Sequence, residues 1–212
     1  MIKAVIFDLD GVLVSTDEMH FKAWSRLAGE IGITTFTKED NVRQRGVSRM
    51  ASLEIVLEKS SKSFTDKEKE ELAARKNDYY CEMLKSLTPN DVLDGALDFL
   101  KFLKKNNIKT AVGSASKNAP IILERTGLTD YLDAISCGLD VTKSKPDPEV
   151  FLSAANKLGI LPEYCMVVED AHAGIMAAKN GGMYALAVGA AYGDELADVS
   201  MKSLANMDKI IK

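Results

Sequence analysis

Short apolar runs alternate with amphipathic stretches along most of this chain, and the stretches space their apolar residues as a helix does. This alternation predicts strands joined by single helices, and therefore an α/β fold with a doubly wound parallel sheet covered on both faces. We expect strands at 4–7, 110–113, 134–137, 166–168 and 185–188. We expect helices at 94–106, 117–126, 147–158 and 171–179. Ser116 is the expected N-cap of the second helix, and Asp147 with Pro148 is expected to begin the third.

Residues 16–87 interrupt this alternation, because they show helical spacing throughout and no convincing strand. We therefore predict a core domain formed by residues 1–15 and 88–212, with an all-helical cap domain, residues 16–87, inserted after the first strand. Thr65 and Glu68 have the spacing of a capping box that opens a helix running to about Leu87. The expected apolar face of this helix consists of Leu72, Tyr79, Met83 and Leu87.

Composition excludes several classes of protein. The chain has 212 residues, of which 46% are hydrophobic and 27% charged, with a net charge of −4. No cluster of Lys or Arg stands out, so we expect no nucleic-acid partner. No apolar run approaches the ~20 residues that span a bilayer, and the N-terminal residues lack a signal-like apolar core. We expect a soluble, cytoplasmic monomer without a membrane partner, whose three cysteines are reduced thiols.

Polar side chains follow several predicted strands at the edge where a parallel sheet binds its ligands. Asp8 and Asp10 follow the first strand, Ser114 follows the second, and Glu169 with Asp170 follows the fourth. An Asp-x-Asp pair alone is more often two loop caps. Carboxylates gathered from several strand ends instead need a cation, and an oxygen-only donor set suits Mg²⁺.

Three basic residues complete the candidate set. Lys145 lies in the loop before the 147–158 helix, where it is either a solvated charge or a group that meets a phosphate. Lys76 falls near the centre of an apolar helix face, so it either extends its ammonium to water or binds an anion. Arg49 follows Ser48 in the first turn of another predicted helix, where a guanidinium and a helix N-terminus bind anions together.

These residues resemble the four motifs of the haloacid dehalogenase superfamily: FDLDGVL at 7–13, the strand-terminal Ser114, Lys145-Pro146 and Glu169-Asp170. The 16–87 insert resembles the mobile cap of that superfamily. Four further segments resemble its phosphohexomutases: EMHFKAW at 18–24, RGVSRMASL at 45–53, LAARKND at 72–78 and SASKN at 114–118. Where relatives commonly have an acid, this chain has Ser15, at the expected hinge between sheet and cap.

The resemblance implies roles for these residues. Asp8 would be the nucleophile that becomes an aspartyl phosphate, and Asp10 the general acid and base. Ser114 and Lys145 would hold the transferring phosphoryl oxygens. Mg²⁺ would bind at Asp8, Asp10 (through the Leu9–Asp10 backbone), Glu169 and Asp170. The implied substrate-binding residues are His20, Trp24, Gly46, Val47, Ser48, Arg49, Ser52, Lys76, Ala115, Ser116, Lys117 and Asn118. His20 shares a helical stripe with Trp24, so it could equally be a structural core histidine.

Three functions are compatible with this set. The first is a mutase that interconverts β-glucose 1-phosphate and glucose 6-phosphate through glucose 1,6-bisphosphate, with a small sugar phosphate as its only partner. The second is a Mg²⁺-dependent sugar-phosphate phosphatase that uses the same Asp8 and Asp10. The third, a non-catalytic phosphate-binding module, is disfavoured by the complete set of reactive residues. Basic residues on both sheet and cap favour the mutase, because its bisphosphate carries two phosphates.

Overall fold

The computed structural model describes residues 1–205 and 207 and shows a six-stranded, fully parallel sheet with the strand order β3-β2-β1-β4-β5-β6. The strands are β1 (Ala4–Phe7), β2 (Lys109–Gly113), β3 (Ala134–Ser136), β4 (Cys165–Glu169), β5 (Tyr184–Ala187) and β6 (Val199–Ser200). The doubly wound parallel sheet is confirmed. The two-residue edge strand β6 was not predicted, because so short a segment has no recognisable period.

Alternate side chains of β1 enter two different hydrophobic clusters, as expected for a strand buried on both faces. Val5 and Phe7 pack in one cluster with helices α5 and α6, whereas Ala4 and Ile6 pack in the other with α7 and α8. These four helices are α5 (Ala96–Lys105), α6 (Ala119–Arg125), α7 (Glu149–Leu158) and α8 (His172–Asn180). Short 3₁₀ turns lie at Pro89–Asp91, Thr129–Tyr131, Pro162–Tyr164 and Gly189–Ala191.

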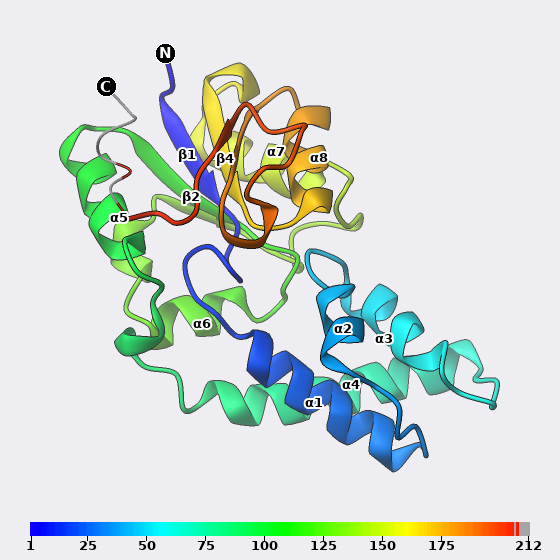
Figure 1. Ribbon diagram of the computed structural model, residues 1–212. Helices are drawn as coiled ribbons and strands as arrows, with labels where there is room; N and C mark the ends of the chain where they lie inside the picture. Colours follow the sequence, from blue (N-terminus) through cyan, green and yellow to red (C-terminus); the bar gives the residue numbers. More distant parts are fainter. Residues whose placement is uncertain (206, 208–212) are drawn as a thin grey trace.

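Four helices lie between β1 and β2 in the sequence and form a group of their own beyond one end of the sheet (Figure 1). They are α1 (Asp17–Glu30), α2 (Lys38–Val42), α3 (Arg49–Leu57) and α4 (Asp66–Leu84). A third hydrophobic cluster, drawn only from residues between Trp24 and Ala73, packs α1, α3 and α4 together. The C-terminal half of α4 behaves differently, since Tyr80 and Leu84 join the cluster that contains Phe7. Among the described residues, no helix is both long and apolar enough to cross a membrane.

Of two predicted helix starts, the one at Ser116 is wrong and the one at Asp147 and Pro148 is confirmed. Ser116 is not the N-cap of α6, which begins at Ala119 after Asn118; the Ser116 hydroxyl accepts the Asn118 amide at 3.2 Å and forms a turn before the helix. α7 is assigned from Glu149, but Pro148 already has helical dihedral angles (φ −75°, ψ −2°) and Asp147 Oδ1 accepts the Glu149 amide at 3.0 Å. Asp147 and Pro148 therefore begin this helix as predicted.

The capping box at Thr65 and Glu68 is confirmed, but the predicted apolar face of α4 was partly wrong. The buried side chains repeat every fourth residue, at Leu72, Lys76, Tyr80 and Leu84, with Ala73 beside them. Tyr79 instead turns its hydroxyl to Glu30 Oε1 at 2.7 Å, and Met83 is only partly buried. The helix ends at Leu84, and Lys76 lies within the buried face as predicted.

Candidate active site

Three carboxylates meet at the carboxyl end of the sheet, where the strand order reverses on either side of β1. Phe7 is in register with Val168, so Asp8 follows β1 beside Glu169, the last residue of β4, and Asp170. One oxygen from each of these three residues lies within 4.8 Å of the others, and Asp8, Glu169 and Asp170 are called the acid cluster below. All three side chains are buried. The prediction that these acids come together is confirmed.

Lys145 lies between two of the carboxylates. Its ammonium is 2.5 Å from Asp8 Oδ1 and also donates to Glu169 Oε1, with none of its side chain exposed. Burial opposes the charged form of this lysine, but Asp8 and Glu169 outweigh burial and raise its pKa. Glu169 Oε2 accepts the Ala171 amide at 2.9 Å. Lys145 is thus a structural counter-ion of the acid cluster, and not a solvated loop charge.

The acid cluster keeps an excess of negative charge, since one ammonium faces three carboxylates. Burial, followed by repulsion from Glu169 and Asp8, raises the pKa of Asp170 to about 8. Burial raises the pKa of Glu169 as well, against the lowering effect of Lys145. A compact oxygen-only donor set with surplus negative charge fits a hard divalent cation such as Mg²⁺.

Asp10 is not part of the acid cluster, and its carboxylate is held by Thr16, the residue before α1. Asp10 Oδ1 accepts the Thr16 amide at 3.1 Å and also the Thr16 hydroxyl. Burial raises the pKa of Asp10 to about 6, against the lowering effect of the Thr16 hydroxyl. Its other oxygen, Oδ2, lies 4.0 Å from His20 Nε2. Asp8 and Asp10 therefore have different surroundings, which suits different chemical roles.

Two cations from the helical segment face the same pocket. Lys76 is 2% exposed, and its ammonium is 2.8 Å from His20 Nδ1 and 4.7 Å from the ring centroids of Trp24 and Tyr80. Burial and then the charge of Arg49 lower the pKa of Lys76 to about 7. Burial, Lys76 and Arg49 lower the pKa of His20 as well. When Lys76 is charged its ammonium can only donate, so the ring nitrogen Nδ1 then accepts and the His20 proton is on Nε2.

Neither Lys76 nor Arg49 forms an ion pair with an acidic side chain within the described part of the chain. Burial lowers the pKa of Arg49, as it does for Lys76. A cation that is buried, as Lys76 is, or partly buried, as Arg49 is, and that has no acidic partner is costly unless it has a ligand to bind. The two side chains together thus form a ready site for an anion.

The 114–118 loop forms the wall of the pocket on the sheet side. The Ser116 amide donates to Ser114 Oγ at 3.1 Å, which fixes the turn after β2. Asn118 Nδ2 donates to Asn77 Oδ1 at 2.9 Å, so the loop contacts α4 directly. Lys117 is exposed and does not line the pocket.

Most predicted substrate-binding residues line this one pocket together with Asp8, Asp10, Ser114 and Asp170. They are His20, Trp24, Gly46, Val47, Arg49, Ser52, Lys76, Ala115, Ser116 and Asn118. Ser48 lies outside the lining and is the N-cap of α3, where its hydroxyl accepts the Ala51 amide at 3.2 Å.

Sequence reasoning missed several residues that line the pocket, namely Asp17, Asn41, Gln44, Arg45, Asn77 and Tyr80. Arg45 donates to Asp17, which links the loop after α2 to the start of α1. Gln44 Nε2 donates to the Ser52 carbonyl at 2.9 Å. Arg45 and Asn77 belong to segments that the sequence had singled out, whereas Gln44 and Tyr80 carry no local pattern that marks them.

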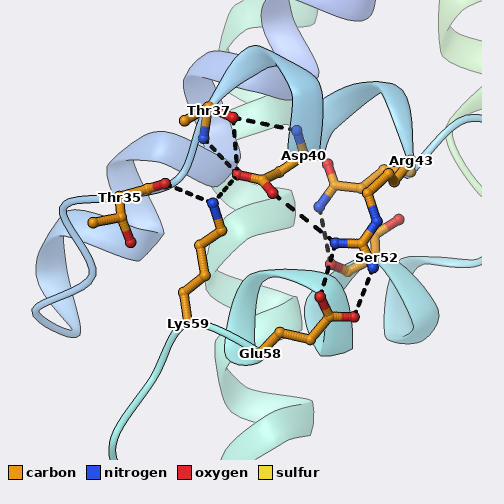
Figure 2. Close-up of polar contacts among 8 residues, drawn as sticks. Thr35, Thr37, Asp40, Arg43, Ser52, Glu58 and Lys59 are labelled. Atoms are coloured by element: carbon orange, nitrogen blue, oxygen red, sulfur yellow. Dashed lines mark hydrogen bonds and ion pairs between the residues drawn. The ribbon is translucent and has the colours of Figure 1, made fainter.

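A polar network ties α2 to the C-terminal end of α3 (Figure 2). Thr37 and Asp40 form a capping box that begins α2. Lys59 joins Asp40 Oδ2 at 2.5 Å to the Thr35 carbonyl at 2.8 Å, and Arg43 makes two 2.8 Å bonds to Glu58. The start of the 43–48 loop is thereby tied to the C-terminal end of α3.

Comparison with known proteins agrees with this geometry. The family model for the haloacid dehalogenase-like hydrolases matches residues 2–182. The chain belongs to the haloacid dehalogenase-like hydrolase family.

Individual relatives are more specific. The chain is 46% identical over 189 residues to a beta-phosphoglucomutase from Bacillus subtilis (strain 168), which covers 88% of this chain and 83% of that protein. It is 33% identical to a phosphorylated carbohydrates phosphatase from Thermotoga maritima, over 85% of this chain and 82% of that one. A crystal structure of beta-phosphoglucomutase from Clostridium difficile superposes with a TM-score of 0.90 at 39% identity, covering 96% and 92% of the two chains.

Proposed function

We propose that the protein is a phosphohexomutase that interconverts β-glucose 1-phosphate and glucose 6-phosphate through an aspartyl-phosphate enzyme and glucose 1,6-bisphosphate. The observation that carries the proposal is the pocket with two charged ends. One end has Asp8 beside Lys145 and the acid cluster, and the other has Lys76 and Arg49, which form no ion pair with an acid among the residues that the structure describes. A hexose bisphosphate carries phosphates at both ends of the sugar, so it matches this arrangement. The Bacillus subtilis relative supports the same assignment.

In the proposed reaction, Asp8 carries the phosphoryl group and Asp10 moves the proton. The 6-hydroxyl of β-glucose 1-phosphate attacks the phosphorus of the phosphoaspartate, Asp10 accepts the hydroxyl proton, and the Asp8 carboxylate leaves. The bisphosphate then turns in the pocket. Asp8 attacks the phosphorus at C1, Asp10 returns its proton to the C1 oxygen, and glucose 6-phosphate leaves the phosphorylated enzyme.

The surrounding residues position these groups. Lys145 holds the Asp8 carboxylate and places a positive charge beside the transferring phosphoryl oxygens, and Ser114 can donate to them. Mg²⁺ bound by Asp8, Glu169, Asp170 and the main chain at Asp10 would neutralise charge between Asp8 and the incoming phosphate. Lys76 and Arg49 bind the phosphate that does not react. The loop residues Ser116 and Asn118, which line the pocket, contribute to the same sugar phosphate, whereas the exposed Lys117 does not.

Several further assignments belong to this proposal. The helical residues 16–87 form a cap over a core of residues 1–15 and 88–212, which the separate hydrophobic cluster between Trp24 and Ala73 supports. The enzyme works as a cytoplasmic monomer on a small sugar phosphate, with no nucleic-acid or membrane partner. Glucose 1,6-bisphosphate primes Asp8 and Mg²⁺ is the cofactor.

One experiment separates the mutase from the phosphatase. Purified protein with Mg²⁺, β-glucose 1-phosphate and a trace of glucose 1,6-bisphosphate should form glucose 6-phosphate, measured with a coupled dehydrogenase, while little inorganic phosphate appears. Mainly inorganic phosphate would make the protein a phosphatase, like its Thermotoga maritima relative. Omitting the bisphosphate is the control, because an unprimed mutase starts slowly and a phosphatase does not need priming.

A further inference from the structure

Tyr80 places a buried phenol hydroxyl one helical turn after Lys76. The side chain is 1% exposed, and its ring lies 4.0 Å from the His20 ring between centroids. A buried tyrosine needs a partner for its hydroxyl. That partner is the hydroxyl of Thr16, with an oxygen–oxygen distance of 2.7 Å. Tyr80 therefore contacts the residue that holds Asp10.

The direction of this hydrogen bond follows from the chemistry of the three groups. A threonine hydroxyl has one proton, and Thr16 gives it to Asp10 Oδ1, because a carboxylate only accepts. The bond between Tyr80 and Thr16 must then have Tyr80 as its donor. Two hydrogen bonds therefore run in series, from Tyr80 to Thr16 and from Thr16 to Asp10. Tyr80 and Thr16 are 64 residues apart in the chain, and Thr16 and Asp10 are 6 residues apart.

These hydrogen bonds distinguish the two oxygens of Asp10. Oδ1 accepts both the Thr16 hydroxyl and the Thr16 amide. Oδ2 accepts no comparable bond from Thr16 and faces His20 Nε2 at 4.0 Å. Oδ2 is therefore the oxygen left to take and return a substrate proton.

We propose that Tyr80 is a positioning residue for the proton-transfer step, and that it acts through Thr16. By donating to Thr16, Tyr80 prevents the Thr16 proton from turning toward the phenol and directs it to Asp10 Oδ1. Asp10 is then held with Oδ2 toward the substrate. This inference rests on the proposed function, in which Asp10 is the acid and base.

The test removes the hydroxyl and keeps the ring. Tyr80→Phe should lower kcat of the mutase reaction by about tenfold, a fraction of what general acid–base catalysis contributes. KM should change by less than about twofold, since no contact with the sugar is lost. Tyr79→Phe is the matched control, because it removes a hydroxyl bonded to Glu30 from the neighbouring position of the same helix. Its kcat should equal that of the wild type.

A double-mutant cycle shows whether Tyr80 acts through Thr16. Thr16→Val should lower kcat on its own, and adding Tyr80→Phe should then lower it by less than about twofold further. Thr16→Ser keeps the hydroxyl and should keep the full effect of Tyr80→Phe. Multiplicative losses in the Val background would overturn the proposal. So would a Tyr80→Phe variant with the kcat of Tyr79→Phe, or one that is unfolded at the assay temperature, since the hydroxyl would then serve the fold.

The same measurements separate this inference from the proposed function. A wild-type protein without mutase turnover, or an Asp10→Asn variant with full activity, would contradict the proposed function itself. Mutase turnover that depends on Asp10 but is unchanged by Tyr80→Phe would contradict only the role proposed for Tyr80.

Discussion

Lys145 Nζ lies 2.5 Å from Asp8 Oδ1, although the two residues are 137 positions apart in the chain. The same ammonium donates to Glu169, so one buried cation joins the loop before α7 to the ends of β1 and β4. This contact holds the candidate nucleophile in place while it offsets part of the negative charge of the acid cluster. The contact contributes to the fold and to the chemistry together, and its removal should affect both.

Replacing Lys145 with Met should therefore destabilise the metal-free protein by roughly 3–5 kcal/mol, because buried carboxylates lose their counter-ion. Phosphoryl transfer should be lost as well. Urea unfolding with and without Mg²⁺ measures the first effect, and Mg²⁺ should restore part of the loss. Lys143→Met is the control, since that lysine is 69% exposed and its pair with Asp147 contributes about 0–1 kcal/mol. Equal stability of the two variants would contradict the role given to Lys145.

The two aspartates of the first motif should respond differently to a chemical phosphoryl donor. An acyl phosphate has a leaving group that needs no proton, so Asp10→Asn should still be phosphorylated on Asp8, whereas Asp8→Asn should not. Mass spectrometry of the intact protein detects the added phosphoryl group. Both variants should lose mutase turnover by roughly a thousandfold or more. A phosphorylated Asp8→Asn protein would place the acceptor elsewhere.

Lys76 should make the free energy of unfolding depend on pH. Its pKa is lowered to about 7 in the folded protein, so the unfolded chain binds more protons between pH 7 and the ordinary lysine value of about 10.4. Stability therefore rises with pH over that window, and the penalty of the buried charge is fully present below pH 7. Lys76→Met should remove this penalty and stabilise the protein at pH 6 by roughly a few kcal/mol, with the gain fading by about pH 10.

Urea unfolding of both proteins at pH 6 and pH 9 measures that difference. Lys67→Met, an exposed position on the same helix, should show no such pH-dependent gain. A Lys76→Met variant that is less stable than the wild type at pH 6 would show that the buried ammonium does not destabilise the ligand-free protein.

The stabilising effect of Lys76→Met should come with a loss of ligand binding. Lys76→Ala and Arg49→Ala should each weaken sugar-phosphate binding by roughly ten- to a hundredfold, since each removes a charge-assisted contact to phosphate. Calorimetric titration with a non-reacting sugar phosphate measures the dissociation constant. A large fall in melting temperature with unchanged binding would instead make both residues structural.

Gly174 should be required for the position of Glu169, because a Cβ at this position would overlap the Glu169 carboxylate. Gly174→Ala should lower kcat/KM by roughly a hundredfold through displacement of that carboxylate. Gly29→Ala in α1 is the matched control, since a Cβ there meets no atom within 4 Å, and it should stabilise the protein by about 0.5–1 kcal/mol. Unchanged kinetics in Gly174→Ala would show that Glu169 can move without consequence.

Removal of divalent ions should abolish turnover, and adding Mg²⁺ should raise the melting temperature of the metal-free protein, because the ion binds only the folded acid cluster. Asp170→Asn should remove most of this thermal shift. Asp98→Asn, whose side chain is 89% exposed, should retain it. A melting temperature insensitive to Mg²⁺ would exclude a resident metal at Asp8, Glu169 and Asp170.

Much of the site could be predicted because its residues follow strands. The apolar run of β1 and the position of Asp8 directly after it are local features, and parallel strands bring such positions to one edge. The unusual position of Lys76 was also visible in the sequence, since a charge on an apolar helix face is unusual. The face of α4 was only partly predicted, because Tyr79 and Tyr80 have equal hydrophobicity and the choice between them depends on how α4 lies against its neighbours.

Local sequence patterns were enough to predict strands β1 to β5, the helices between β1 and β2, and the polar residues that follow β1, β2 and β4. These depend on hydrophobic period and capping, which act within a turn or two of chain. The pairing of side chains, such as Lys145 with two carboxylates or Tyr80 with Thr16, could not be predicted and is seen only in the folded protein. Such contacts join residues far apart in sequence, and they depend on strand order and helix orientation, which are set by packing across the whole molecule.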